Sequence, residues 1–154
     1  MIFKRIGIDF HGVINYNPLF FRHFNKVVAL NGLEIHIVSG GPREYISQYL
    51  QENRILYHHL WCILDKYVPL GVVTYFDNGK FHMDDELWNT AKGKYCAEND
   101  IAIMIDDSKI YGQSFVTPYC LYDNKKQLGY INNRAIDFNQ SPQQVFTSLC
   151  EALT

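Results

Sequence analysis

The sequence has little charge, no closely paired cysteines and no long hydrophobic run. Charged residues occupy 19% of the 154 positions, against ~25% in a typical globular protein. The formal net charge of −2 provides no global basic field, so neither nucleic acid nor a membrane surface is indicated as a partner. No apolar run approaches the ~18 residues of a membrane helix. The N-terminal segment MIFKRIGIDF is interrupted by Lys4, Arg5 and Asp9, so it does not resemble a signal peptide.

The cysteines are few and scattered. Cys62, Cys96, Cys120 and Cys150 each lie within or beside an apolar stretch, and none belongs to a CxxC pair. We therefore expect reduced, mostly buried thiols and a cytoplasmic location. Apolar residues make up 47% of the chain, and a chain of this length can bury a core without disulfides. We expect one domain over residues 1–154.

Short apolar runs alternate with helical patterns along the chain. The runs predict strands over 2–10, 34–38, 72–76 and 101–105, with a short edge strand over 119–122. The apolar run over 101–105, IAIMI, is typical of a central strand buried on both faces. Strands that alternate with helices predict βαβ units and a mainly parallel sheet with helices on both faces. The expected fold class is therefore α/β, with a three-layer Rossmann-like arrangement.

Helices are predicted from apolar spacing and capping residues. The predicted helices cover 18–30, a segment that begins at Gly41-Pro42, 58–67, a segment that begins at Asp84 or Asp85 and ends near 98, and a last segment that begins at Ser141-Pro142. Ser141 and Gln144 form a predicted capping box. Residues 123–139 are polar and rich in turn formers, so we expect a surface loop or hairpin there, and the Lys125-Lys126 pair within it needs no function.

Polar residues follow three of the predicted strands. Asp9 lies at the end of the first, and Ser39-Gly40 and Asp106-Asp107 follow the second and the fourth. Ligands of an open parallel sheet bind outside the carboxyl ends of its strands, so we expect these residues to meet at one edge. Three converging carboxylates repel one another unless a cation lies among them. Hard carboxylate oxygens favour Mg²⁺, which in proteins also binds substrate phosphate.

The segment Ser39-Gly40-Gly41-Pro42 is suited to phosphate binding. It offers a hydroxyl and free backbone N–H groups at the start of a helix, where the helix dipole favours an anion. Lys92 or Lys94 can supply a balancing positive charge.

These motifs, in this order, resemble the haloacid dehalogenase (HAD) superfamily. The resemblance covers roughly residues 2–114, and its motifs are Asp9-x-His11-Gly12-Val13, Ser39-Gly40, a lysine, and Asp106-Asp107-Ser108. It implies Mg²⁺-dependent phosphoryl transfer through an aspartyl-phosphate on Asp9. The implied metal ligands are Asp9, the backbone carbonyl of His11, Asp106 and, directly or through water, Asp107. A phosphorylated substrate is the implied partner.

The same resemblance implies roles for the remaining site residues. Ser39 and Gly40 would bind the transferring phosphoryl group, and Lys92 would stabilise both the nucleophile and the phosphate charge. Lys92 is preferred to Lys94 because it lies nearer the start of its helix, although the alternative stays open. A response-regulator receiver also phosphorylates an Asp near Mg²⁺. Its acidic pair follows the first strand, however, whereas here the pair follows the fourth.

His11 departs from the family pattern. Phosphatases of this family usually carry a second Asp two positions after the nucleophile, which protonates the leaving oxygen and then activates water. A histidine with a pKa near ~6.5 can do acid–base work at neutral pH. Three outcomes therefore stay open: a catalytic His11, slow or altered chemistry, or a non-catalytic domain that binds Mg²⁺ and a phosphorylated ligand or a protein partner.

The chain leaves no room for a large cap domain. One helix fills the interval between Asp9 and Ser39, and two helices and a strand fill most of that between Ser39 and Lys92. We therefore expect an open site that admits a large or nucleotide-like phosphorylated substrate, or one that self-association covers. Four tyrosines could either stack on a base or a sugar or pack in the core: Tyr16, Tyr57, Tyr75 and Tyr111.

The remaining histidines carry little functional signal. We expect His23, His36, His58 and His59 to be surface or hydrogen-bonded residues rather than ligands. His82 with Asp84 and Asp85 suggests a second metal site, but an acidic helix start explains the two aspartates equally well.

Overall fold

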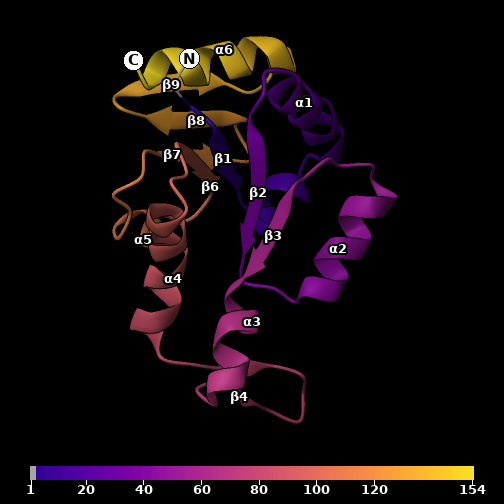
Figure 1. Cartoon of the computed structure of the whole chain (residues 1–154), viewed down its shortest axis with the longest axis vertical. Helices are drawn as coiled ribbons and strands as arrows, with labels where there is room; N and C mark the ends of the chain where they lie inside the picture. The colour runs from indigo at the N-terminus through magenta and orange to yellow at the C-terminus, as the bar shows by residue number, and fades with distance from the viewer. Residues whose placement is uncertain (1–2) are drawn as a thin grey trace.

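A seven-stranded, mainly parallel sheet forms the centre of the molecule (Figure 1). The computed structural model describes residues 3–154, and the strand order is β3-β2-β1-β6-β7-β8-β9. The first five of these strands are parallel and the last two are antiparallel. The strands are β1 (Arg5–Ile8), β2 (Glu34–Ser39), β3 (His59–Cys62), β6 (Ile103–Asp106), β7 (Tyr119–Asp123), β8 (Leu128–Ile131) and β9 (Arg134–Asp137). The predicted α/β class with a Rossmann-like sheet is confirmed, and Met1 and Ile2 lie outside the described residues.

Helices cover both faces of this sheet. On one face, α1 (Pro18–Leu30), α2 (Arg43–Glu52) and α6 (Pro142–Ala152) contribute Phe24, Leu50 and Phe146 to the main core. On the other face, α4 (Asp85–Glu98) packs Cys96 against Met104 of β6, and α5 (Lys109–Gly112) lies beside α4. Since strand side chains alternate between faces, β6 sends its isoleucines to the first core and Met104 to the second.

The capping residues place the helix starts where the sequence predicts them. Asn17 accepts a hydrogen bond from the backbone of Phe20 at the start of α1. Asp84 caps α4 in the same way, and Ser141 and Gln144 form the predicted capping box of α6. The predicted helix over 18–30 is confirmed at both ends, and Asn31 is its C-cap residue.

The prediction of a helix over 58–67 is wrong in its first half. That half is the edge strand β3, and only Ile63–Tyr67 are helical (α3). Within β3, Leu60 and Cys62 are buried on the face that α2 covers, while His59 is exposed. Pairing with β2 outweighs local helix propensity here, because it completes the backbone hydrogen bonds of that strand.

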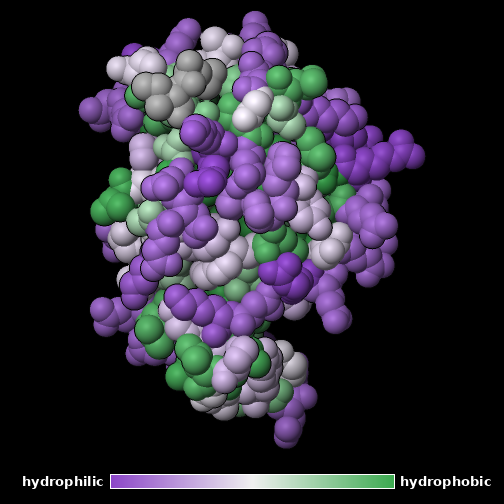
Figure 2. Space-filling model, viewed as in Figure 1, coloured by the Kyte–Doolittle hydropathy of each residue, from purple (hydrophilic) through white to green (hydrophobic). Residues whose placement is uncertain are grey.

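The predicted strand over 72–76 does not join the central sheet. Its centre, β4 (Thr74–Tyr75), pairs with β5 (Phe81–His82) in a separate two-stranded sheet, and both strands are exposed. A turn at residues 77–79 closes this hairpin locally. With α3, the hairpin projects below the carboxyl ends of the strands in Figure 1, and hydrophobic residues gather on this lower part of the face shown in Figure 2.

The predicted edge strand over 119–122 is an interior strand. Residues 123–139 form the hairpin of β8 and β9, which extends the sheet beyond β7. Asn132 and Asn133 both have positive φ angles, of 49° and 61°, as a type I′ hairpin turn requires. The hairpin alternative for this segment is therefore confirmed.

The cysteines lie mostly inside the molecule. Cys62, Cys96 and Cys120 are buried, and Cys150 is half-buried. Burial raises the pKa of Cys96 and of Cys120 to about 12 in each case. In the described part of the chain, no helix has the length and apolar character needed to cross a membrane.

Candidate functional site

Three adjacent parallel strands end at one edge of the sheet and bring the predicted residues together. β1 lies between β2 and β6, and the residues at or just after their carboxyl ends are Asp9, Ser39 and Asp106. The backbone N–H of Asp9 donates to the carbonyl of Ile105 at 2.9 Å, which continues the pairing of β1 with β6 by one residue. The parallel register therefore holds Asp9 and Asp106 side by side.

Lys92 lies between these two aspartates. Its Nζ atom is 2.9 Å from Asp9 Oδ1 and 2.9 Å from Asp106 Oδ2. The three side chains are almost completely buried, with at most 5% of any one exposed. Lys94 is exposed on the same helix. The structure therefore brings Lys92 into the site and leaves Lys94 outside it.

The site carries more negative than positive charge. Asp9, Asp106 and Asp107 each offer a carboxylate oxygen, and these oxygens lie within 4.8 Å of one another. Burial, together with the nearby Asp106 carboxylate, raises the pKa of Asp9 well above its usual range. Partial burial and the same Asp106 carboxylate raise the pKa of Asp107. Burial alone would lower the pKa of Lys92, but Asp9 and Asp106 more than offset it and raise that pKa.

One ammonium group cannot balance three carboxylates. The formal surplus is two negative charges, which a single divalent cation would neutralise. The available donors are hard carboxylate oxygens, the type that Mg²⁺ prefers, although Ca²⁺ and Mn²⁺ share that preference. The residues therefore fit a divalent cation of this class.

The turn after β1 depends on a glycine. Gly12 has a φ angle of +82°, and a Cβ atom at this position would lie 2.0 Å from Asp107 Oδ2. The Gly12 N–H donates to Asn15 Oδ1 at 2.7 Å, and its carbonyl accepts from Asn124 Nδ2 at 2.9 Å. These bonds hold the turn against Asp107 and join it to the loop between β7 and β8.

The His11 side chain lies at the mouth of the site. It is exposed, and its Nε2 atom is 3.1 Å from the carbonyl oxygen of Gly41. Because a carbonyl oxygen only accepts hydrogen bonds, Nε2 carries the proton in this contact. The predicted use of the His11 backbone carbonyl as a metal ligand stays a prediction.

The phosphate-binding candidates lie at the end of β2. Ser39 is completely buried, and its Oγ accepts from the backbone N–H of Gly41 at 3.4 Å. Gly40 lies against the indole of Trp88, where a Cβ atom would be 2.7 Å from the ring. Any side chain at position 40 would therefore displace the tryptophan.

A cavity of about 420 Å³ opens beside Gly40 and Gly41, and the buried Ser39 is not among its lining residues. Asp9 and Lys92 line it, together with three aromatic residues, Phe81, Trp88 and Tyr111. Trp88 Nε1 donates to the Tyr111 hydroxyl at 2.7 Å, and Lys92 Nζ lies 4.8 Å from the centre of the Tyr111 ring. The sequence alone assigns these three no role beyond packing or stacking. Trp88 and Lys92 are four residues apart on one helix, and that spacing is a signal that could have placed Trp88 in the site.

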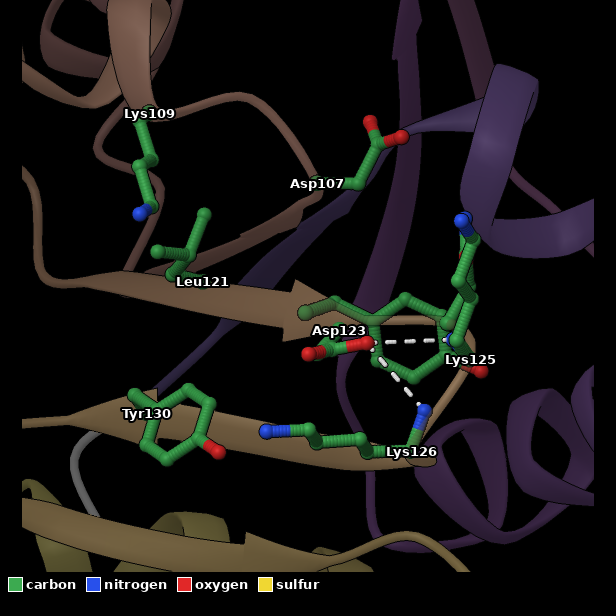
Figure 3. Close-up of a pocket in the computed structure, with 9 residues that line it drawn as sticks. Asp107, Lys109, Leu121, Asp123, Lys125, Lys126 and Tyr130 are labelled. Atoms are coloured by element: carbon green, nitrogen blue, oxygen red, sulfur yellow. Dashed lines mark hydrogen bonds between the residues drawn. The ribbon is translucent and has the colours of Figure 1, made fainter.

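A second cavity, of about 590 Å³, adjoins the first at Asp107 (Figure 3). Lys109 reaches into it from α5, and Lys125 and Lys126 from the turn after β7. The Asp123 carboxylate accepts from the backbone N–H groups of Lys125 and Lys126 at 3.1 Å each, which fixes that turn. None of the three ammonium groups has a carboxylate oxygen within 4.0 Å among residues 3–154.

No family model, no curated protein and no solved structure matches this chain. The functional conclusion therefore depends on the geometry of the residues described above.

Proposed function

We propose that this chain is a Mg²⁺-dependent phosphatase of the HAD type that forms an aspartyl-phosphate on Asp9. The observation that carries the proposal is the contact of the buried Lys92 ammonium with both Asp9 and Asp106, beside Asp107. The charge surplus of this cluster calls for a divalent cation, and an incoming phosphate dianion would be repelled without one. Bound Mg²⁺ would be held by the three aspartates and the His11 carbonyl, and would offset the charge of the phosphoryl group.

The two oxygens of Asp9 would have different tasks. Oδ1 already accepts from Lys92 and, at 2.8 Å, from the backbone N–H of Phe10. We therefore assign the attack to Oδ2, which forms a bond to phosphorus while the bond from phosphorus to the leaving oxygen breaks. Lys92 keeps Oδ1 in place and stabilises the negative charge during transfer. Ser39 and the backbone N–H of Gly40 would hold the non-bridging phosphoryl oxygens.

His11 would supply and recover the proton. The leaving oxygen takes a proton from the His11 imidazolium as its bond to phosphorus breaks. The neutral imidazole then accepts a proton from the water that attacks the aspartyl-phosphate, and inorganic phosphate leaves with Asp9 restored. A competing hypothesis is a binding domain without turnover, and the contact of His11 Nε2 with the Gly41 carbonyl favours it, because that contact occupies the Nε2 proton.

The substrate would be a phosphate monoester with a second anionic group. The three lysines of the second cavity face open space next to Asp107 without a carboxylate partner among the described residues. Tyr130 lines the same cavity and is 42% exposed, so its ring is free to stack on a base or a sugar. A nucleotide-like molecule could then place one phosphate over Asp9 and the other among the lysines.

Hydrolysis of p-nitrophenyl phosphate with and without Mg²⁺ tests the proposal. Wild type should show weak activity that needs Mg²⁺, Asp9→Asn should show none, and His11→Asp should show an altered pH profile. An inert wild type with an active His11→Asp variant would support the binding-domain hypothesis. Full activity of Asp9→Asn would exclude the aspartyl-phosphate route.

A further inference from the structure

A second cluster of ligand-type side chains lies at the opposite end of the parallel strands. Glu34 and His36 are two positions apart on β2, so their side chains point to the same face of the sheet. His59 of β3 is the register partner of His36 and therefore shares that face. The strand pairing thus gathers a carboxylate and two imidazoles, although residues 34 and 59 are far apart in the sequence. We propose that Glu34, His36 and His59 bind a divalent transition metal, with Zn²⁺ as its representative.

The distances suit three ligands around one ion. Glu34 Oε1 lies 3.3 Å from His59 Nε2 and 2.5 Å from His36 Nε2. One ligand atom from each residue lies within 4.8 Å of the other two. Zinc bonds to nitrogen and oxygen are ~2.0–2.2 Å long, which separates tetrahedral donors by roughly 3.3–3.5 Å. The Glu34 and His59 pair already has this spacing, and the Glu34 and His36 pair would open by roughly 0.8–1.0 Å to reach it.

A second layer of contacts orients the buried histidine. His36 Nδ1 lies 2.6 Å from the hydroxyl of Tyr95 on α4, and the Tyr95 ring stacks on Trp61 at 4.6 Å between centroids. A tyrosine hydroxyl can donate or accept, so it can satisfy Nδ1 in either tautomer. When Nε2 binds a metal, Nδ1 keeps its proton and donates it to the Tyr95 oxygen. Partners of this kind fix the ring orientation of metal-bound histidines.

The surroundings determine which ion the cluster would prefer. Two imidazole nitrogens and one carboxylate suit Zn²⁺ and its neighbours in the first transition row, and they do not suit Mg²⁺ or Ca²⁺. Arg5 Nε lies 3.3 Å from Glu34 Oε1 and offsets its charge, so the site lacks the strong negative field of the Asp9 cluster. His59 is 54% exposed, which leaves room for water to complete the coordination. The two clusters should therefore select different ions.

Titration of the full chain with Zn²⁺ in excess Mg²⁺ tests this proposal. Excess Mg²⁺ would compete with Zn²⁺ for the carboxylate cluster, so an equivalent of Zn²⁺ that stays bound reports the histidine site. His59→Ala should weaken this binding at least tenfold and should leave the fold intact, because His59 is largely exposed. His23→Ala, which removes an exposed histidine from α1, should bind like wild type. Equal Zn²⁺ affinities for wild type and His59→Ala, or no Zn²⁺ binding in excess Mg²⁺, would overturn the proposal.

Cobalt provides a direct view of the ligands. Co²⁺ bound at a site with two imidazoles and low coordination number should give visible absorption bands that disappear in His59→Ala and persist in Asp106→Asn. Bands that persist in His59→Ala would also overturn the proposal. None of these measurements depends on phosphatase activity, so their outcome is independent of the function proposed for Asp9.

Discussion

Gly12 lies so close to Asp107 that a Cβ atom at Gly12 would be 2.0 Å from Oδ2 of that aspartate. The Asp107 carboxylate therefore packs directly against the backbone of Gly12. The φ angle of +82° at Gly12 is one that residues with a side chain rarely adopt. The turn after Asp9 and the acidic pair after β6 thus depend on each other. A substitution at Gly12 should affect both the backbone and the carboxylate cluster.

Gly12→Ala should abolish Mg²⁺-dependent hydrolysis and lower the free energy of unfolding by more than the ~1–2 kcal/mol of a left-handed alanine, because Asp107 must also move. Gly32→Ala is the matched control, since Gly32 has a φ angle of +84° and a Cβ atom added there would meet nothing within 4 Å. Gly32→Ala should lose only the ~1–2 kcal/mol of unfolding free energy that a left-handed alanine costs, and it should keep its activity. Urea denaturation and phosphatase assays measure the two effects. Equal losses in the two variants would contradict the role assigned to the Asp107 contact.

Lys92→Met should be strongly destabilising and inactive. The substitution leaves the Asp9 and Asp106 carboxylates buried without their common partner, which typically costs about 3–5 kcal/mol. Lys94→Met changes an exposed residue of the same helix and should stay within about 0.5 kcal/mol of wild type. Added Mg²⁺ should stabilise Lys92→Met more than wild type, because the variant has the larger negative surplus. A stable, active Lys92→Met protein would exclude this lysine from the mechanism.

Without a metal, the Asp9 cluster should make stability fall as the pH rises. The pKa values of Asp9 and Asp107 are raised in the folded protein, so the folded state holds their protons more tightly than the unfolded state. Their stabilising contribution is complete below the unfolded pKa near ~3.9 and is lost as the pH rises through the folded values. Mg²⁺ favours the ionised forms and should flatten this decline.

Denaturation at a series of pH values, with EDTA and with Mg²⁺, measures the effect. Asp107→Asn removes one of the titrating groups, so the difference between its pH dependence of stability and that of wild type is the contribution of Asp107. Other acids, such as Glu34, whose pKa is lowered, contribute to both proteins. If wild type and Asp107→Asn show the same pH dependence in EDTA, the raised pKa of Asp107 is not a source of instability.

The lysine cavity should contribute to the binding of substrates with two phosphates and not to the binding of those with one. Lys125→Ala combined with Lys126→Ala should raise KM for a nucleoside bisphosphate by about tenfold at low salt and leave KM for p-nitrophenyl phosphate within about twofold. The effect should shrink as the salt concentration rises, because screening weakens exposed charges. Lys26→Ala, on the exposed side of α1, is the control. An equal rise in KM for both substrates would contradict a separate site for the second anion.

Local sequence was sufficient for much of the fold. The helix over 18–30 has the predicted bounds, and Asn17 and Asn31 cap its two ends. Capping involves residues only a few positions apart, so local sequence contains this information. The positions of Asp9, Ser39 and Asp106 at strand ends also followed from the apolar runs before them. The errors concern how segments pair. Pairing with β2 outweighs local helix propensity in β3, the hairpin of β8 and β9 makes β7 an interior strand, and β4 pairs with β5 instead of joining the sheet.

The sequence by itself determined the α/β class, the order of the motifs and the carboxylates available for a cation. Only the tertiary structure decided which residues meet. It placed Lys92 rather than Lys94 between two aspartates, brought His36 beside His59, and surrounded a cavity with lysines from two separate segments. Contacts of this kind depend on strand register and on the direction in which a buried side chain leaves its helix. Both are set by packing across the whole sheet, and no short stretch of sequence contains that information.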